Sequence, residues 1–371
     1  MVRRSPPAPR TAASRPQAKA SAKPEAAGHG SALKPLNLAL QGGGAHGAYT
    51  WGVLDALLAD GRLTLEALSA TSAGSLNAVA LADGWRRGGV DGARESLQRL
   101  WQAIAEAGRF NLLRPPWLDV FMHGMQQAVP LEWSPPYLWM SGLMQMMSPY
   151  QLNPLNINPL REVLEQQIDF EALRASPALK LFVSATNVET GKIKVFERQQ
   201  LSVDVVLASA CLPTLFQAVE IDGEHFWDGG YMGNPAIFPL IYECDSADVL
   251  IVHVNPVLRR GVPRTAAEIA NRVNEISFNS SLMREMRAIA FVTSLIDRGK
   301  LSPDDARRMR IHSIRSDALM AAQGVASKMD TAWPYLCELR DAGRRQALAW
   351  LGEHFDQIGI DSTVDIRGEF L

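Results

Sequence analysis

The amino-acid sequence predicts an α/β protein: a three-layer α/β/α domain with a mainly parallel central sheet. Two observations predict this class. Short apolar runs alternate with longer segments of helical spacing, an order that produces parallel strands with helices on their faces. The composition is that of a globular protein, with 47% hydrophobic and 20% charged residues in a chain of 371. That length fits one large domain or two modest ones.

The first strands and helices follow each other in a repeated order. The apolar run 36–40 ends at a glycine-rich turn and predicts a buried strand. Residues 48–60 carry apolar side chains at helical spacing and are closed by Gly61, which is typical of a helix end. A second strand over 65–70 and a second helix over 74–85 complete the unit.

Further strands follow, and the chain ends in a helical part. Asp222-Gly223 is a strong signal for a two-residue turn, so the apolar runs on either side of it predict a hairpin. The predicted later strands are 179–185, 193–196, 216–221, 224–227 and 249–254. From Thr265 onward the pattern is helical with charged faces. We therefore expect a tail over 1–34, an α/β domain over 35–260, and a helical part over 261–371 packed on the same domain.

Residues 1–34 predict a disordered basic tail. The segment has seven basic residues and one acidic residue, so its net charge is +6 and that of the remainder is −8, for a total of −2. Without any aromatic residue it cannot bury enough apolar surface to offset the entropy of ordering it. It also lacks the apolar run of a signal peptide. Its charge suits anionic lipid, whereas the acidic remainder does not suit nucleic acid.

An apolar insertion is expected at about residues 115–159. No charged residue occurs between Trp133 and Leu160, but five prolines interrupt this run, so it does not predict a membrane span. The methionines and tryptophans of the insertion suit a boundary between water and lipid. The insertion is therefore either a lipid-facing surface or ordinary packing on its own domain.

Three cysteines, Cys211, Cys244 and Cys337, are too few and too scattered for a disulfide framework or a zinc site. Thiols in a reducing compartment fit this pattern. We expect a cytoplasmic protein with no metal and no organic cofactor. Peripheral contact with a membrane through the tail and the insertion stays open.

A glycine-rich turn, Gly42 to Gly47 (GGGAHG), lies between the first predicted strand and the first helix. Glycines allow another group to approach bare backbone N–H donors, and the helix that follows adds the positive end of its dipole. The turn therefore suits an anion. That anion is either the pyrophosphate of a dinucleotide or the oxyanion of an acyl-transfer intermediate.

A second turn, residues 70–74 (ATSAG), favours acyl transfer. It also lies between a strand and a helix, where a nucleophile elbow projects its serine, here Ser72, from the end of the strand. A dinucleotide fold would instead have an acidic residue at the end of this second strand, and Ala70 and Thr71 occupy that place.

A third motif, Asp228-Gly229-Gly230, follows the predicted hairpin. The three motifs in this order resemble the patatin-like phospholipase family of lipid acyl hydrolases, in its bacterial type. Residues 185–191 (ATNVETG), 207–216 (LASACLPTLF) and the pair Asn234-Pro235 agree with the same resemblance, which covers roughly Leu36 to Val254.

The resemblance implies a Ser–Asp dyad that cleaves carboxylic esters in lipids or phospholipids through an acyl-serine intermediate. Ser72 matches the nucleophile and Asp228 the residue that accepts its proton. Gly42, Gly43 and Gly44 match the oxyanion hole. Supporting motif positions are Gly47, Ala70, Gly74, Gly229 and Gly230. The sequence departs from the family pattern at Ala70, where glycine is usual, and at His46, where a basic residue is common.

Two other functions stay open. His253 follows Ser72 and Asp228 in the chain order of α/β-hydrolase triads, so a Ser–His–Asp esterase or thioesterase is one alternative. A lipid-binding regulatory protein without turnover is the other. On the simplest structural interpretation, Ser72 caps a helix and Asp228 is a turn residue.

Overall fold

The computed structural model describes residues 33–109, 147–302 and 306–371, and residues 33–371 form one compact unit. All but the last two residues of the predicted tail lie outside the described residues. So does most of the predicted insertion, of which residues 147–159 are described. No helix in the described ranges is long and apolar enough to cross a membrane.

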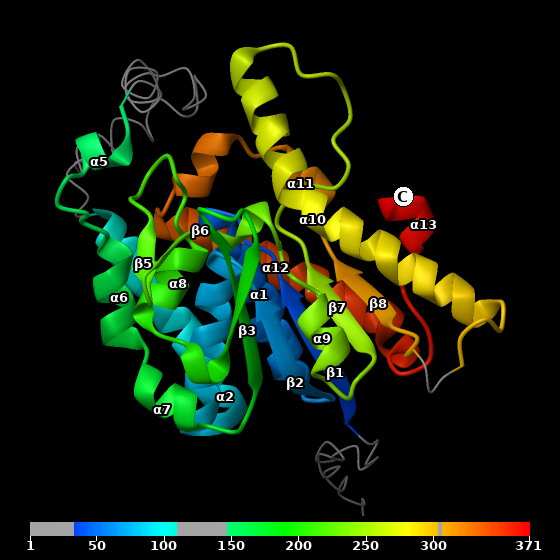
Figure 1. Ribbon diagram of the computed structural model, residues 1–371. Helices are drawn as coiled ribbons and strands as arrows, with labels where there is room; N and C mark the ends of the chain where they lie inside the picture. The colour runs from blue at the N-terminus through cyan, green and yellow to red at the C-terminus, as the bar shows by residue number, and fades with distance from the viewer. Residues whose placement is uncertain (1–32, 110–146, 303–305) are drawn as a thin grey trace, which may run out of the picture. The chain divides into compact units, whose positions relative to one another are not determined.

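One mixed sheet forms the centre of the unit (Figure 1). Its strand order is β5-β6-β3-β2-β1-β7-β8, with β4 paired to β3. The pairs β3–β2, β2–β1, β1–β7 and β7–β8 are parallel, whereas the pairs β3–β4, β3–β6 and β6–β5 at one end of the sheet are antiparallel. The strands are β1 (Lys34–Leu40), β2 (Leu63–Ala70), β3 (Lys180–Asn187), β4 (Ile193–Glu197), β5 (Val219–Ile221), β6 (Glu224–Asp228), β7 (Asp248–Val252) and β8 (Arg310–Ile314). The predicted fold class is confirmed.

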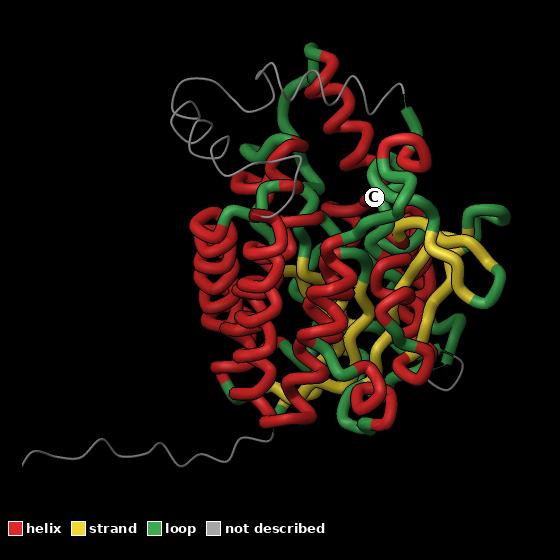
Figure 2. The backbone as a smooth tube through the Cα atoms, turned by 90° about the vertical axis from the view of Figure 1, so that its left-hand side faces the viewer, coloured by secondary structure: helices red, strands yellow, loops and turns green. Residues whose placement is uncertain are grey.

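Helices cover both faces of this sheet. The α-helices are α1 (Gly47–Asp60), α2 (Ala73–Arg109), α5 (Pro149–Leu152), α6 (Pro159–Gln167), α7 (Phe170–Ala175), α8 (Val203–Ser209), α9 (Phe238–Tyr242), α10 (Ala266–Asp297), α11 (Asp317–Ala321), α12 (Trp333–His354) and α13 (Ile366–Phe370). Short 3₁₀ turns are η1 (Gly44–His46), η3 (Arg198–Gln200), η4 (Gly229–Tyr231), η5 (Val325–Met329) and η6 (Phe355–Gln357). Figure 2 shows the helices of one layer side by side in front of the strands.

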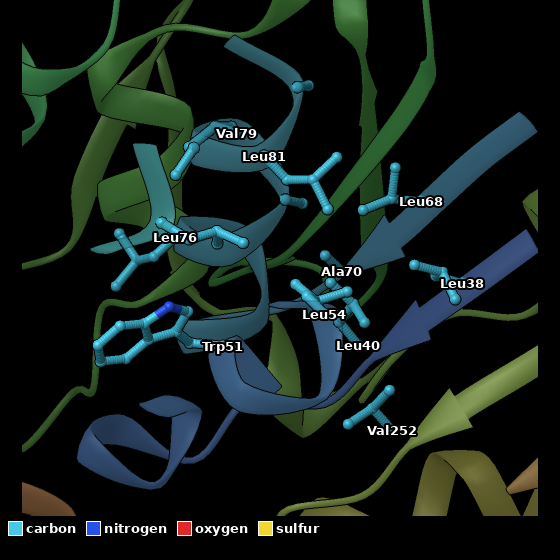
Figure 3. Close-up of a cluster of buried hydrophobic side chains, with 14 of the residues drawn as sticks. Leu38, Leu40, Trp51, Leu54, Leu68, Ala70, Leu76, Val79, Leu81 and Val252 are labelled. Carbon is cyan, nitrogen blue, oxygen red and sulfur yellow. The ribbon is translucent and has the colours of Figure 1, made fainter. Parts of the chain in front are cut away.

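Two hydrophobic cores follow from the alternation of side chains along the strands. Leu38 and Leu40 of β1 pack with α1, α2, α8 and α12, while Ala39 between them packs with α9, α10 and α13. Adjacent strand residues point to opposite faces, so a fully apolar strand feeds both cores. Figure 3 shows part of the first core, in which Leu40 of β1 and Ala70 of β2 lie beside Leu54 of α1, and Leu68 of β2 faces Leu81 of α2. Burial on this scale stabilises the sheet by roughly 25 cal/mol per Å² of apolar surface.

The structure differs from the sequence prediction in two places. The helix predicted over 74–85 continues to Arg109, interrupted at Gly88 and Gly89, whose backbone is not helical. The part over 261–371, predicted as helical, contains β8, which pairs in parallel with β7. Its other regular elements are helices. Arg310 and His312 of β8 bind the carboxylate of Asp248 on β7, so polar side chains interrupt the apolar pattern of this strand.

The C-terminal helix α12 lies directly against α1. The two helices approach so closely at Gly52 and Gly343 that a Cβ on either glycine would clash with backbone of the other helix. Because α1 begins at the glycine-rich turn, α12 helps to fix the position of that turn.

Substitution of Gly343 by alanine tests this helix contact. We expect Gly343→Ala to lower the free energy of unfolding by about 1–3 kcal/mol, because the added methyl group must push α12 away from Tyr49 of α1. Gly352→Ala on the same helix is the control, since a Cβ there meets nothing within 4 Å and alanine favours the helix by about 1 kcal/mol. Denaturant unfolding measures both. Equal effects of the two substitutions would show that the contact is not tight.

Candidate active site

Ser72 lies in a strained turn between β2 and α2. Its φ is 53°, in the left-handed region that a non-glycine residue rarely adopts. Its N–H donates to Ser209 Oγ at 2.9 Å, and the Ser75 hydroxyl donates to its carbonyl oxygen at 2.6 Å. Gly74 follows where a Cβ would clash with the carbonyl oxygen of Leu40, so α2 begins in close contact with β1. The strain is therefore held by hydrogen bonds and by close packing on both sides.

The glycine loop at the end of β1 faces this serine. A Cβ on Gly42 would lie 2.5 Å from Ser72 Cβ, so glycine is needed for this approach. The Gly42 N–H donates to Asn234 Oδ1 at 2.7 Å. In the described part of the chain, no acceptor is recorded for the N–H groups of Gly43 and Gly44. These two backbone donors are therefore unpaired within the described residues.

Asp228 ends β6, and its carboxylate is completely buried. Oδ1 accepts the N–H of Gly230 at 2.7 Å. Oδ2 has no partner of hydrogen-bonding geometry among the described residues. Burial raises the pKa of Asp228 to about 7, against the lowering effects of the Gly230 N–H, the Ser72 hydroxyl and the positive charge of Lys328.

The predicted motif residues surround these groups. Ala70 is fully buried at the end of β2. A Cβ added to Gly47 would crowd Ala73 and Trp101. A Cβ on Gly229 would crowd the Ser184 carbonyl, and one on Gly230 would crowd the Phe278 ring. The structure thus brings together Ser72, Asp228 and the glycine loop.

Four polar residues that sequence reasoning did not single out for a role hold the loops of the site. Gln41 accepts the N–H groups of Val254 and Asn255 and donates to the Asn234 carbonyl and to Asn279. The other three are Asn234, Asn255 and Lys328. The sequence did contain a signal for Gln41, because it is a polar residue at the end of a buried strand. No local signal marks Lys328.

His253 points away from this assembly. Val252 and Val254 on either side belong to the first core, whereas the His253 ring stacks on Phe370 of α13 with centroids 6.0 Å apart. Neither ring nitrogen has a hydrogen-bond partner in the described ranges. Burial lowers the pKa of His253 to about 3, so the ring is neutral. The geometry gives no support to a triad that uses this residue.

The described residues contain no group of three or more histidine, cysteine or acidic side chains that could hold a metal ion. What they offer is a serine on a strained turn after a parallel strand, together with a buried carboxylate and free backbone donors. This is the arrangement of a serine hydrolase on an α/β sheet.

The sequence matches the patatin-like phospholipase family over residues 38–241, more than half of the chain, and the protein belongs to that family. Members of this family are serine lipid acyl hydrolases. No curated protein matches the chain in sequence.

Solved structures of the proteins VipD and ExoU are remotely similar. VipD from Legionella pneumophila is 19% identical, with a TM-score of 0.43 over 87% of this chain and 68% of VipD. The type III effector protein ExoU is 16% identical, with a TM-score of 0.31 over 88% of this chain and 54% of ExoU. In a complex with SpcU from Pseudomonas aeruginosa, ExoU matches with 14% identity and a TM-score of 0.26 over 84% of this chain and 53% of ExoU. The chain thus spans about half the length of ExoU.

Replacement of His253 by phenylalanine tests its structural role. We expect His253→Phe to retain activity and to keep the free energy of unfolding at pH 7 within about 1 kcal/mol, because an apolar ring replaces two unpaired nitrogens. The folded pKa of about 3 lies below the unfolded 6.5, so this histidine costs stability as the pH falls from 6.5 towards 3. The variant should therefore resist acid better than the parent. Denaturant unfolding at pH 4.5 and pH 7 measures this, and a folded but inactive variant would favour the triad.

Proposed function

We propose that the protein hydrolyses a carboxylic ester of a lipid or phospholipid through an acyl-Ser72 intermediate, with Asp228 as the proton acceptor. The observation that carries this proposal is the buried carboxylate of Asp228, which lies close enough to the Ser72 hydroxyl for that hydroxyl to lower its pKa, and whose Oδ2 accepts no hydrogen bond of normal geometry. A serine hydroxyl becomes a good nucleophile only when a base lies within reach.

In the first half of the reaction, Asp228 Oδ2 takes the proton of the Ser72 hydroxyl as Oγ forms a bond to the ester carbonyl carbon. The carbonyl oxygen becomes an oxyanion, and the N–H groups of Gly43 and Gly44 stabilise it. Each such donor contributes about 2.7–4 kcal/mol in comparable sites. Gly42 serves the same loop indirectly, since its own N–H is held by Asn234. The carbon–oxygen bond to the alcohol then breaks, and Asp228 returns its proton to the leaving oxygen.

In the second half, water replaces the alcohol. Asp228 accepts a proton from this water as the water oxygen attacks the acyl carbon, and Ser72 Oγ leaves and recovers the proton. The products are a free carboxylic acid and the original enzyme. A pKa of about 7 suits a group that must both accept and return a proton near neutral pH.

A lipid substrate fits the surroundings of the site. Leu155 and Ile157, in the described end of the predicted insertion, are 80% and 62% exposed. Three hydrogen bonds connect this segment to the site. The Gln217 side chain donates to the Asn153 carbonyl oxygen, and the Cys211 thiol donates to the Gln217 carbonyl oxygen at 3.1 Å. The Cys211 carbonyl oxygen then accepts the Asp228 N–H at 2.7 Å. We propose that this apolar segment, with the basic tail, gives a cytoplasmic enzyme peripheral contact with a membrane.

Substitution of the dyad tests the reaction. Ser72→Ala and Asp228→Asn should each lower hydrolysis of a short-chain ester by about 10⁴-fold or more, and the double variant should be little worse, because the two groups act as a unit. Ser72→Ala should also lose labelling by a fluorophosphonate, which reacts with an activated serine. Ser294→Ala is the control, since Ser294 lies near the end of α10 and its hydroxyl donates to the Phe291 carbonyl oxygen of the same helix. A parent protein that is neither labelled nor active would favour a lipid-binding protein without turnover.

Substitution of the exposed apolar residues tests the proposed contact with a membrane. Leu155→Ser with Ile157→Ser should reduce activity on phospholipid vesicles several-fold more than on a soluble ester, because a monomeric substrate needs no apolar docking surface. Ile360→Ser is the matched control, as Ile360 is 77% exposed in the C-terminal part. Proportional losses on both substrates would contradict the interfacial role.

A further inference from the structure

A lysine from the C-terminal part of the chain reaches the active site. Lys328 belongs to η5, which packs on η1 of the glycine loop. Gly44 has a φ of 61°, and a Cβ there would clash with the Lys328 carbonyl oxygen. A hydrogen bond of 2.8 Å between His46 Nε2 and Ser327 Oγ fixes the neighbouring residue to the same loop. The backbone of Lys328 is therefore held against Gly44 of the glycine loop.

The ammonium group of Lys328 is held by neutral partners. Nζ donates to Asn255 Oδ1 at 2.9 Å and to Asn274 Oδ1 at 3.3 Å. Asn255 in turn donates to the Gly42 carbonyl oxygen at 2.8 Å, so two hydrogen bonds connect Nζ to the glycine loop. Nζ also lies 5.9 Å from the centre of the Phe278 ring, which contacts Gly230 beside Asp228. In the described ranges, no ion pair involves this lysine.

Two acidic groups act on Lys328, Glu275 more strongly and Asp228 after it, and of the two only Asp228 has no ion pair among the described residues. The charges of Asp228, Glu275 and Arg259 influence the pKa of Lys328, and the charge of Lys328 influences the pKa of His46. Glu275 is already paired with Arg259 at 2.5 Å and with Arg272 at 3.2 Å. His46 is buried and neutral, since burial and then the charge of Lys328 lower its pKa to about 3. Because Lys328 is partly buried, the protein screens its charge less than bulk water would.

We propose that the ammonium group of Lys328 is the fixed cation of this active site. Acting through space on Asp228 and on the position beside Gly43 and Gly44, it favours the two negative charges that ester hydrolysis requires. These charges are the carboxylate that accepts the proton and the oxyanion that forms on the substrate. Lys328 is thus a positioning residue for the proposed function on which this inference rests.

Ionisation of Asp228 and of Lys328 should make the activity depend on pH. The charge of Lys328 lowers the pKa of Asp228, which is about 7, so loss of that charge raises it. Burial lowers the pKa of Lys328 itself to about 8. Activity should therefore rise with pH as Asp228 ionises and fall as Lys328 loses its proton. Tyr231 and Cys211, which also face Asp228, have raised pKa values and stay neutral over this range.

The test is the pH profile of kcat/KM on a neutral short-chain ester, with the released acid measured by chromatography. Lys328→Met should move the rising limb upward by about one pH unit and lower kcat/KM at pH 7 by about tenfold. Lys328→Arg keeps a charge that does not titrate below pH 12, so it should remain active and lose the falling limb near pH 8. Lys300→Met, at an exposed lysine after α10, should keep the parent profile.

A folded Lys328→Met with the parent profile would overturn the inference. If that variant does not fold, Lys328→Arg decides alone, because a falling limb that persists near pH 8 would also overturn it. Failure of the proposed function looks different: the parent protein itself would show neither ester hydrolysis nor fluorophosphonate labelling.

Discussion

Burial of one carboxylate is the constraint on which the site depends. Asp228 lies at the end of β6, completely enclosed, with one oxygen held by the Gly230 N–H and the other left open. A charged carboxylate is unfavourable in a buried position, and this burial raises the pKa of Asp228 to about 7. The same burial converts a weak base into one suited to neutral pH. Stability and reactivity therefore compete at this residue, as is usual where a fold carries a strained active site.

The sheet supplies the geometry that makes this burial useful. Parallel strands β1 and β2 end side by side, so their following turns place the glycine loop and Ser72 together. Antiparallel pairing of β6 with β3 then sets Asp228 opposite Ala185 at the same edge. Close contacts at Gly42 and Gly74 leave little freedom for these turns. The site is thus assembled from three separate strand ends, each fixed by the core beneath it.

Local signals in the sequence predicted most of this arrangement. Apolar runs, the Asp222-Gly223 turn and the three glycine-rich motifs each depend on a few neighbouring residues, so β1, β2, the hairpin and the candidate residues could be found. The strand β8 was missed because Arg310 and His312 interrupt its apolar pattern to bind Asp248. Lys328 was missed for a different reason. Its partners, Gly44 and Asn255, are far away in the chain, and only the folded structure brings them near.

Because η5 and α12 pack on the glycine loop and on α1, the candidate site is complete only when the C-terminal part of the chain has folded. Ser72 and Asp228 are synthesised before the segment that packs on Gly44 and the helix that packs on α1. A nascent chain, or one cut by a protease before residue 324, holds both reacting groups while its glycine loop lacks this support.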